Sequence, residues 1–290
     1  MTPAVSFGVP VYNGETYLAA ALESVQHQDL EDIEIVVSDN GSTDGTDAIC
    51  GAAARSDPRI RYLRSPVNRG GSWNYMRVAR AATAPLFSWM AADDIKLPSF
   101  ASSCVAALAQ DGDAVMACPR TQLIDERDRV FENLNDESMG LDAQDPHVRV
   151  RNLLRSQASH VTYGVIRMAA LRRTRGILPM VGDDMVLLTE LLCQGPALTV
   201  DERSFWQRRH TEQFSAQAEG QVKWHAPTGS VRLAFPQTRL NLELYRAVAL
   251  SSLPVAEKAR CWAQISPSWV LPRWRGMARD LWTAVGPVRS

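Results

Sequence analysis

The stretch AVSFGVPVYNGETYLAAALESVQHQDLEDIEIVVSD, residues 4–39, contains three segments with distinct hydrophobic patterns. It opens with an apolar run at 4–12, continues as an amphipathic helical pattern at 15–28, and returns to an apolar run at 33–39. Strands that are apolar on both faces are typical of parallel sheets, because helices cover each side. The stretch therefore predicts a β-α-β unit at the start of an α/β domain.

The same alternation continues to residue 124. Helical patterns follow at 46–56, 72–82 and 98–110, and strand-like apolar runs at 60–65, 86–92 and 114–124. Repeated units of this kind predict a mostly parallel, doubly wound sheet flanked by helices. In such sheets ligands bind beyond the carboxyl ends of the strands, so polar residues there are the first candidates for a site.

The composition is that of an ordinary globular protein, with 46% hydrophobic and 22% charged residues among 290. A net charge of −1 argues against nucleic-acid binding. The first 15 residues lack the basic and apolar regions of a signal peptide, and no run approaches the ~18 apolar residues of a membrane span. Five scattered cysteines without a CxxC spacing predict buried free thiols and a cytoplasmic location.

Beyond residue 124 the pattern is less regular. Residues 125–146 are acidic and lack apolar periodicity, which predicts an exposed loop. Pattern returns with helices at 147–156, 168–174 and 183–195, a strand at 161–167 and a pair of strands at 197–210. From about residue 222 the chain is helical and rich in Trp and Arg.

Polar residues follow each of the first four predicted strands. The segments are PVYNGE (10–15), SDNGSTDGT (38–46), PVNRGGSWN (66–74) and AADD (91–94). Capping of the next helix accounts for Ser42, Thr43 and Asp44, but less well for Asp39, which directly ends an apolar strand. The first strand is not followed by GxGxxG, so the pattern does not indicate an NAD or FAD fold.

The order and spacing of these segments over residues 4–100 resemble the nucleotide-binding half of a family 2 glycosyltransferase. The segments YGVIRMAALRRT, GDDMVLLTELLCQG and FWQRRH, within 163–210, resemble the second half of a bacterial subgroup of that family. The resemblance implies a GT-A fold and a nucleotide-sugar donor. It divides the chain into a transferase domain at 1–220, with a nucleotide-binding half at 1–125 and an acceptor half at 147–215, and a helical extension at 221–290.

The resemblance also implies which residues contact the donor nucleotide. Pro10 and Tyr12 would contact the base, as would Asp39, and Glu15 would make a polar contact with the nucleotide. The implied set is Pro10, Tyr12, Glu15, Asp39, Asn68, Arg69 and Asp93. Two alternatives stay open: Tyr12 packs the strand end, and Arg69 is a solvated side chain.

Asp93 and Asp94 need a positive partner, because adjacent like charges repel and burial of either one is costly. The resemblance implies a Mg²⁺ or Mn²⁺ ion bound by Asp94 and His210, with Asp93 near the ribose or the donor sugar. Ala91 stands where the longer form of the motif has another carboxylate. As alternatives, the two aspartates cap a helix beginning near Leu97, and His210 is an ordinary packed residue.

An inverting transfer needs a base that takes the proton of the acceptor hydroxyl. The resemblance implies Asp184 for this role, with Asp183 in reserve, at the start of a helix. An isolated Asp has a pKa near 3.9, and an adjacent carboxylate with partial burial would raise it. The alternative is that both residues cap the helix, which would lower the pKa instead.

The C-terminal segment is basic and holds four of the eight tryptophans, Trp262, Trp269, Trp274 and Trp282. Trp and Arg on short helices are typical of a membrane interface. The alternative is that the tryptophans pack on the domain or on another subunit. Residues 255–290 are therefore a candidate for peripheral contact with the inner face of a membrane or for self-association.

Together these expectations describe an inverting glycosyltransferase. It would move a hexosyl or deoxyhexosyl group from a UDP- or dTDP-sugar to a hydroxyl of a glycan, lipid-linked or small-molecule acceptor, as in polysaccharide biosynthesis. One alternative, a sugar-1-phosphate nucleotidyltransferase, would show a basic Gly-rich loop, and PVYNGETY has neither Lys nor Arg. The other, an inactive nucleotide-sugar-binding protein, is kept open by Ala91 and opposed by intact Asp93, Asp94 and Asp184.

Overall fold

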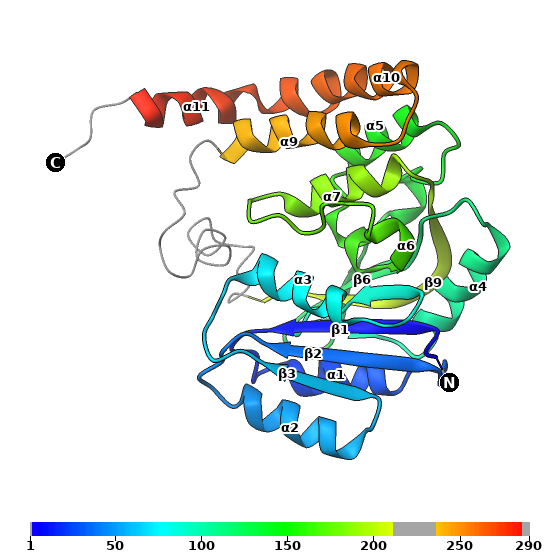
Figure 1. The fold of residues 1–290 in the computed structure, drawn as a ribbon, viewed down its shortest axis with the longest axis vertical. Coiled ribbons are helices and arrows are strands. Elements are labelled where there is room, and N and C mark those ends of the chain that lie inside the picture. The colour runs from blue at the N-terminus through cyan, green and yellow to red at the C-terminus, as the bar shows by residue number, and fades with distance from the viewer. Residues whose placement is uncertain (1, 211–235, 286–290) are drawn as a thin grey trace.

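The computed structural model describes residues 2–210 and 236–285, which Figure 1 shows as a twisted central sheet with helices on both sides. The strands are β1 (Val5–Val11), β2 (Ile33–Asp39), β3 (Ile60–Arg64), β4 (Leu86–Trp89), β5 (Ile95–Lys96), β6 (Met116–Ile124), β7 (Val130–Asn133), β8 (Val165–Arg167) and β9 (Ala197–Arg208). The helices are α1 (Leu18–Gln26), α2 (Thr46–Ser56), α3 (Gly71–Ala81), α4 (Phe100–Gln110), α5 (Pro146–Ser156), α6 (Met168–Leu171), α7 (Asp183–Leu192), α9 (Pro236–Leu250), α10 (Val255–Ile265) and α11 (Trp274–Val285).

These strands form one sheet in the order β3-β2-β1-β4-β8-β6-β9-β5, with β7 paired to β6. The longer ladders are all parallel: β1 with β2, β2 with β3, β1 with β4, and β6 with β9. The antiparallel pairings of β5, β7 and β8 involve only two or three residues each. The predicted α/β class, a mostly parallel sheet flanked by helices, is confirmed.

Strand β1 lies in the middle of the first half and is buried along its whole length. Gly8 is needed there because a Cβ would lie 2.7 Å from atoms of Phe87 and Val78. The ladder with β2 ends where Val11 pairs with Asp39. The carboxyl ends of β1 and β2 therefore lie side by side, and the polar segments that follow them meet at one edge of the sheet.

Asn74 joins these two strand ends to α3. Its Nδ2 atom donates to the carbonyl oxygens of Val11 (3.2 Å) and Ser38 (2.9 Å), and its Oδ1 accepts from Ser38 Oγ (2.6 Å). Asn74 is buried, and buried amides are stable only when their polar atoms are paired. These bonds hold α3 over the carboxyl edge of the sheet.

The second half of the sheet departs from a purely parallel arrangement. Strand β8 lies between β4 and β6, where Ile166 opposes Phe87 on one side and Met116 on the other. The predicted pair of strands at 197–210 is wrong, because β9 is one continuous strand. Its register against β6 shifts at Pro119, which has no N–H group to offer a ladder.

Residues 125–146 are only partly the exposed loop that the sequence predicted. Strand β7 is exposed at all four positions. In contrast, Asp136 in the following turn is buried and accepts a hydrogen bond from the Thr121 N–H (2.5 Å). Its other oxygen lies 2.8 Å from His160 Nε2. These contacts tie the segment to β6 and to the turn that precedes β8.

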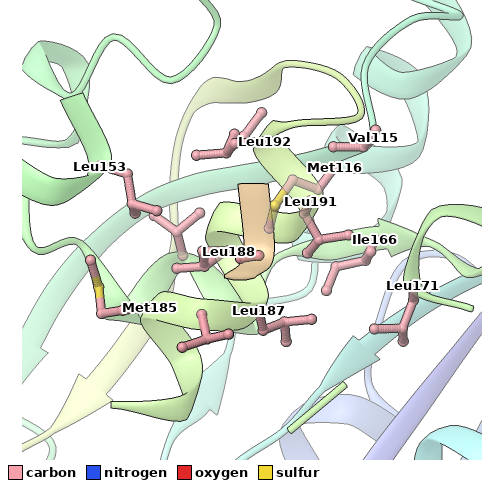
Figure 2. Packing of buried hydrophobic residues seen from close by; sticks show 14 of the residues in the cluster. Val115, Met116, Leu153, Ile166, Leu171, Met185, Leu187, Leu188, Leu191 and Leu192 are labelled. Carbon is pink, nitrogen blue, oxygen red and sulfur yellow. The ribbon is translucent and has the colours of Figure 1, made fainter. Parts of the chain in front are cut away.

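The C-terminal helices cover the second half of the domain (Figure 1). Leu240, Leu244 and Val248 of α9 belong to the same buried cluster as Leu187 and Leu191 of α7. Figure 2 shows the α7 leucines gathered with side chains of β6, β8 and α5 in this cluster. The predicted domain boundary at 220/221 lies outside the described residues.

The tryptophans of the extension divide into packed and exposed ones. Trp269 is buried, and Trp262 Nε1 donates to the Tyr245 carbonyl (3.0 Å), which fits the packing alternative for these two. Trp274 is 57% exposed. The Trp282 side chain lies outside the described part of the chain. Among the described helices, none combines the length and apolar character needed to cross a membrane.

Candidate active site

The loops that follow β1 and β2 are joined by hydrogen bonds. The Asn13 N–H donates to Ser42 Oγ (2.9 Å), and the Glu15 N–H donates to Asp44 Oδ2 (3.1 Å). In return, the Gly45 N–H donates to Glu15 Oε2 (2.7 Å). Glu15 therefore fixes the second loop in this structure, and its contact with a nucleotide stays a prediction.

Pro10 and Tyr12 lie where β1 meets these loops. Pro10 is buried within β1 and pairs in register with Ser38 of β2. Tyr12 is half-buried and follows the last residue of the strand. Both residues therefore lie at the carboxyl edge of the sheet, next to the loop that begins after Asp39.

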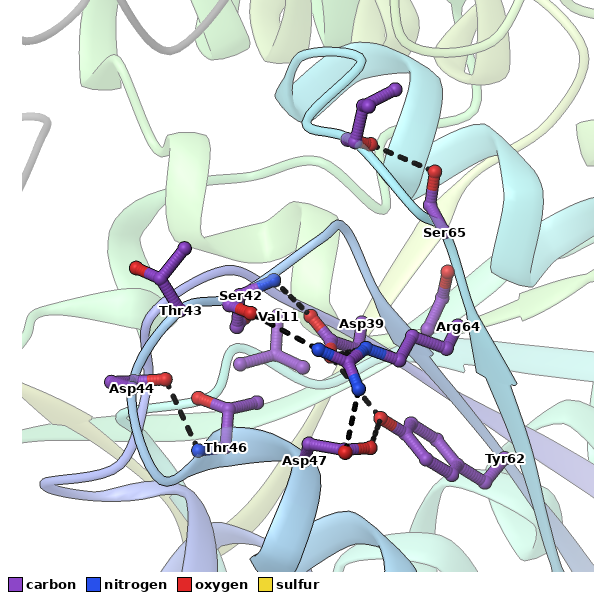
Figure 3. A network of polar contacts seen from close by, with 12 residues as sticks. Val11, Asp39, Ser42, Thr43, Asp44, Thr46, Asp47, Tyr62, Arg64 and Ser65 are labelled. Atoms are coloured by element: carbon purple, nitrogen blue, oxygen red, sulfur yellow. Dashed lines mark hydrogen bonds and ion pairs between the residues drawn. The ribbon is translucent and has the colours of Figure 1, made fainter.

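Asp39 lies at the centre of the polar network shown in Figure 3. Its side chain is fully buried, and Oδ1 accepts a hydrogen bond from the Ser42 N–H (2.8 Å). Oδ2 accepts from Tyr62 OH (3.1 Å) and lies 3.3 Å from Arg64 Nε. Arg64 also pairs with Asp47 (2.6 Å), so its guanidinium covers the Asp39 carboxylate. A nucleobase would reach Asp39 only after the Arg64 side chain moves aside.

Asn68 and Arg69 are held beside β2 by Asn40. Asn40 Nδ2 donates to Asn68 Oδ1 (2.9 Å), and the Arg69 N–H donates to Asn40 Oδ1 (3.0 Å). Gly70 has a φ of 91°, which glycine adopts without strain, and the Arg69 guanidinium lies 5.1 Å from the centre of the Trp73 ring. The sequence did not single out Asn40, although it directly follows Asp39 in a segment that capping only partly explained.

Asp93 lies at the opposite side of the same edge, in contact with His210. His210 Nε2 lies 3.0 Å from Asp93 Oδ2, and the two side chains are 11% and 29% exposed. The ring of Tyr17, just before α1, packs against the His210 ring with 5.0 Å between centres. The structure therefore brings His210 to the adjacent carboxylates, which the sequence predicted only by resemblance.

Asp94 is buried behind Asp93. Only 2% of its surface is exposed, and its Oδ1 accepts a hydrogen bond from the backbone N–H of Arg208 (2.8 Å). Burial raises the pKa of Asp94 well above its ordinary value, and the charge of Asp93 raises it further. The capping alternative for Asp93 and Asp94 is wrong, because α4 begins later, at Phe100, and the N–H of Ala101 in its first turn donates to Gln28 Oε1 (2.9 Å).

Arg208 is a site residue whose importance the sequence did not reveal. Its side chain is buried at the end of β9, where Nε donates to the Asp93 carbonyl (2.7 Å). Its guanidinium carbon lies 4.5 Å from the centre of the Tyr17 ring. The available signal was the segment WQRRH, in which the arginine stands two positions before His210.

Asp183 and Asp184 begin α7. The Asp184 N–H donates to Asp183 Oδ1 (3.0 Å), and the Met185 N–H donates to Asp184 Oδ1 (2.8 Å). Within the described residues, Asp183 Oδ2 is buried and has no hydrogen-bond partner. Burial raises the pKa of both carboxyls, and for Asp183 the charge of Asp184 adds to it. Helix capping alone would lower the pKa of these carboxyls. Their raised pKa values show that burial has a larger effect here than the positive end of the helix.

The pKa of the half-buried Tyr75 phenol responds to both carboxylate groups. Tyr75 OH lies 3.1 Å from Tyr163 OH, and burial raises its pKa. The negative charges of Asp93, Asp94 and Asp183 raise that pKa further. Carboxylates after β4 and at the start of α7 thus both contribute to the raised pKa of this phenol.

The residues at this edge fit a small divalent cation. Mg²⁺ and Mn²⁺ typically take one or two carboxylates and complete their coordination with substrate phosphates and waters. Asp93 and His210 offer a carboxylate and an imidazole that are partly open to solvent. Residues 2–210 and 236–285 contain no group of three or more His, Cys, Asp or Glu side chains arranged for an ion. An ion here would therefore share its coordination with a bound diphosphate.

Comparison with known sequences agrees with this arrangement. A family model described as "Glycosyl transferase family 2" matches residues 6–174. The chain is 30% identical over 115 residues to "Putative glycosyltransferase EpsH" of Bacillus subtilis (strain 168), covering 40% of this chain and 33% of that protein. It is 25% identical over 190 residues to "GalNAc(5)-diNAcBac-PP-undecaprenol beta-1,3-glucosyltransferase" of Campylobacter jejuni, covering 65% and 60%. The chain thus spans between 33% and 60% of the length of these two relatives.

Solved structures share the fold. The S. aureus TarS fragment 1–349 in complex with UDP-GlcNAc has a TM-score of 0.67 at 16% identity, covering 96% of this chain and 79% of that one. The mannosyltransferase PcManGT of Pyrobaculum calidifontis, in complex with GDP-Man and Mn²⁺, has a TM-score of 0.56 at 18% identity, covering 97% and 85%. The sheet and helices of this chain therefore have the GT-A arrangement.

The sequence match extends over more than half of the chain and includes the ends of β1, β2 and β4, where the candidate nucleotide contacts and Asp94 lie, whereas Asp183, Asp184 and His210 lie beyond it. The resemblance seen in the sequence is thereby confirmed: the chain belongs to glycosyl transferase family 2.

Proposed function

We propose that this chain is an inverting, metal-dependent transferase that moves a sugar from a nucleoside diphosphate to an acceptor hydroxyl. One observation carries the proposal: Asp93 and His210, from segments far apart in the sequence, form a partly exposed pair suited to a cation and a diphosphate. Asp183, whose Oδ2 is buried and has no hydrogen-bond partner among the described residues, is suited to act as a base. A leaving group that gains negative charge and a nucleophile that loses a proton are the two needs of this reaction.

The donor nucleotide would lie along the ends of β1 and β2. Tyr12 and Asp39 would contact the base, with Asp39 accepting a hydrogen bond from a base N–H once Arg64 moves aside. Uracil and thymine both carry such an N–H, which supports a UDP- or dTDP-sugar. The remaining nucleotide contacts that we propose are those of Pro10, Glu15, Asn68, Arg69 and Asp93.

Asp93 and His210 are the accessible donors for Mg²⁺ or Mn²⁺. When bound, the cation would neutralise the charge that the departing diphosphate gains. Asp94, the ligand that the sequence favoured, is 2% exposed and has Oδ1 engaged by the backbone N–H of Arg208, so it would reach the cation through Oδ2. Without that contact, Asp94 would stabilise the turn after β4 through its bond with the Arg208 N–H, and Asp93 would contact the cation directly.

Asp183 is the stronger candidate for the base. Its Oδ2 is buried without a hydrogen-bond partner among the described residues, so it is free to accept a proton from a sugar hydroxyl. Its raised pKa makes it a better base than an ordinary aspartate. Asp184, which the sequence placed first, has one oxygen engaged by the Met185 N–H, just as Asp183 Oδ1 is engaged by the Asp184 N–H, and its charge raises the pKa of Asp183.

We propose that the C-terminal segment, residues 255–290, makes peripheral contact with the inner face of an anionic membrane. There the chain would reach a lipid-linked acceptor. Leu271 and Trp274 are 63% and 57% exposed, one helical turn apart, with Arg275 and Arg279 close by in sequence and exposed. Full-length protein should sediment with vesicles containing anionic lipid, and Trp274→Ser should weaken this. Concentration-dependent dimerisation without vesicle binding would instead support self-association.

Thermal-shift measurement over a panel of nucleotide sugars, with and without Mn²⁺, tests donor binding. A ligand that binds only the folded state raises the melting temperature. UDP- or dTDP-sugars are expected to raise it, and more so with Mn²⁺. The absence of any shift from UDP-, dTDP- and GDP-sugars would contradict the proposal, and binding without turnover would favour the inactive-protein alternative.

A further inference from the structure

Arg208 is buried in a position where an unpaired charge would be costly. It is the last residue of β9 and is 1% exposed, whereas its neighbour Arg209 points to solvent. A buried guanidinium is stable only when its charge is paired and its N–H groups are bonded. The partners that meet this need come from three separate segments of the chain.

The first partner is the turn that carries the two adjacent carboxylates. Arg208 Nε donates to the Asp93 carbonyl oxygen (2.7 Å). The backbone N–H of Arg208 donates to Asp94 Oδ1 (2.8 Å). One residue thus fixes the main chain at Asp93 and the side chain at Asp94.

The second partner is the turn between β6 and β7. Arg208 Nη1 donates to the Asp125 carbonyl (2.9 Å), and Nη2 pairs with Asp128 Oδ1 (2.5 Å). Asp128 has a φ of 61°, in the left-handed region that few residues other than glycine adopt. The pairing places a negative charge against the buried guanidinium.

The third partner is Tyr17. The guanidinium carbon lies 4.5 Å from the centre of the Tyr17 ring, and the same ring packs against His210 with 5.0 Å between centres. Arginine over an aromatic face is a favourable contact. Arg208 therefore reaches both members of the Asp93–His210 pair, one through a main-chain carbonyl and the other through Tyr17.

We propose that Arg208 is a positioning residue, which holds Asp93 and His210 at the separation needed to receive a cation and a diphosphate. The inference rests on the proposed function, because it assigns that role to the pair. Groups that orient ligating side chains typically change metal affinity or activity by about 10- to 100-fold when they are altered. Arg208 touches neither nucleotide nor sugar in this role.

Lysine at this position separates orientation from charge. It keeps one positive charge but lacks the planar fork, so it cannot bond the Asp93 and Asp125 carbonyls and pair with Asp128 at the same time. Arg208→Lys is therefore the informative variant. Arg209→Lys is its matched control, because Arg209 is exposed and its side chain bonds only Gln207 among the hydrogen bonds described.

The experiment measures the affinity of the full chain for UDP, dTDP and GDP by calorimetry, with and without Mn²⁺, together with the melting temperature. Arg208→Lys is expected to keep the metal-free nucleotide affinity and to lose about 10- to 100-fold of the gain that Mn²⁺ gives. Donor turnover should show a fall in kcat that exceeds the rise in KM. Arg209→Lys should behave as the wild-type chain does.

Full retention of the Mn²⁺-dependent gain in Arg208→Lys would overturn the positioning role. A fall in metal-free nucleotide affinity as large as the loss of the Mn²⁺-dependent gain would also overturn it, because it would show that the substitution disturbs the whole nucleotide site. If Arg208→Lys does not fold, Tyr17→Leu decides in the same assay: a reduced gain supports the role and a full gain overturns it. If the wild-type chain binds no nucleotide with Mn²⁺, the proposed function itself fails and the inference fails with it.

Discussion

His210 Nε2 lies 3.0 Å from Asp93 Oδ2, although the two residues are 117 positions apart in the sequence. The contact joins the loop after β4 to the residues that follow β9, which are brought together because β9 pairs with β5 just beyond Asp94. It is one of several contacts between residues 1–125 and 147–215, which also meet where β8 pairs with β4 and β9 with β6.

The first prediction concerns this pair. His210→Ala and Asp93→Asn should each remove most of the Mn²⁺-dependent gain in nucleotide affinity, because the first removes the imidazole ligand and the second the charge of the carboxylate ligand. Calorimetric titration with UDP, with and without Mn²⁺, measures the gain. His27→Ala is the matched control, since His27 is exposed at the end of α1 and touches only the Glu23 carbonyl among the bonds described.

The same titration distinguishes the two aspartates. Asp94→Asn should keep the hydrogen bond from Arg208 and lose less of the Mn²⁺-dependent gain than Asp93→Asn. A complete loss in Asp94→Asn with a full gain in Asp93→Asn would restore the order of roles that the sequence suggested.

The second prediction concerns the base. Asp183→Asn should leave nucleotide binding intact and abolish transfer, because the amide cannot accept the proton of the acceptor hydroxyl. It should also raise the melting temperature, since burial raises the pKa of Asp183 and the charged form opposes folding. Each kcal/mol gained corresponds to a rise of ~2–4 °C in a domain of this size. Normal turnover in Asp183→Asn together with loss in Asp184→Asn would assign the base to Asp184.

The third prediction is the pH dependence of kcat/KM. The base acts when deprotonated, so the rate should rise with pH through the pKa of Asp183, which burial and then the Asp184 charge raise above the ordinary value near 3.9. Asp184→Asn removes the neighbouring charge and should move this rise of kcat/KM, the acid limb of the profile, to lower pH. An acid limb that stays in place in Asp184→Asn would contradict the assignment of Asp183.

The fourth prediction concerns stability far from the site. The Asp57 carboxylate accepts hydrogen bonds from the Arg59 side chain (2.8 and 3.0 Å) and from Gln26 Nε2 (3.2 Å). The Arg59 bonds lower the pKa of Asp57 to about 2, although burial of the carboxylate acts to raise it. A lowered pKa stabilises the fold above the unfolded value near 3.9, and this contribution is lost as pH falls from about 4 to about 2.

Asp57→Asn should therefore lower the free energy of unfolding at pH 7 by on the order of 2 kcal/mol. Urea titrations at pH 7 and at pH 3 measure the difference, which should shrink at the lower pH. A difference that is equal at both pH values would show that the ion pair with Arg59 is not its source.

The first half of the fold could be predicted because its signal is local. Each strand from β1 to β4 is a short apolar run followed by polar residues, and each intervening helix has its own periodicity. The carboxyl ends of parallel strands share one edge, so the sequence alone predicts Asp39, Asp93 and Asp94 at that edge.

The second half could not be predicted in the same way. The insertion of β8 between β4 and β6 depends on pairings of only two residues on each side. The single strand β9 contains the polar segment Asp201–Arg203, which in sequence suggests a turn between two strands. The strand pairs with β6 on both sides of this segment, at Ala197–Val200 and at Phe205–Arg208, a tertiary effect that overrides local preference.

The details of the site depend on contacts of the same kind. Nothing local indicates that Arg208 is buried and Arg209 exposed, because alternation along β9 fixes their directions only once its partners are known. Likewise, the sequence could not show that Arg64 covers Asp39 or that Glu15 bonds the Gly45 N–H. These contacts decide which predicted residues are open to a ligand in this structure.

Release of nucleoside diphosphate from UDP-, dTDP- and GDP-sugars, with Mn²⁺ and a sugar or water as acceptor, is the sharpest test of the transferase assignment. The wild-type chain is expected to release the nucleotide from at least one donor, to form a product with inverted anomeric configuration by NMR, and to lose this activity in Asp183→Asn. No release from any donor, or a product that keeps the configuration of the donor, would contradict it.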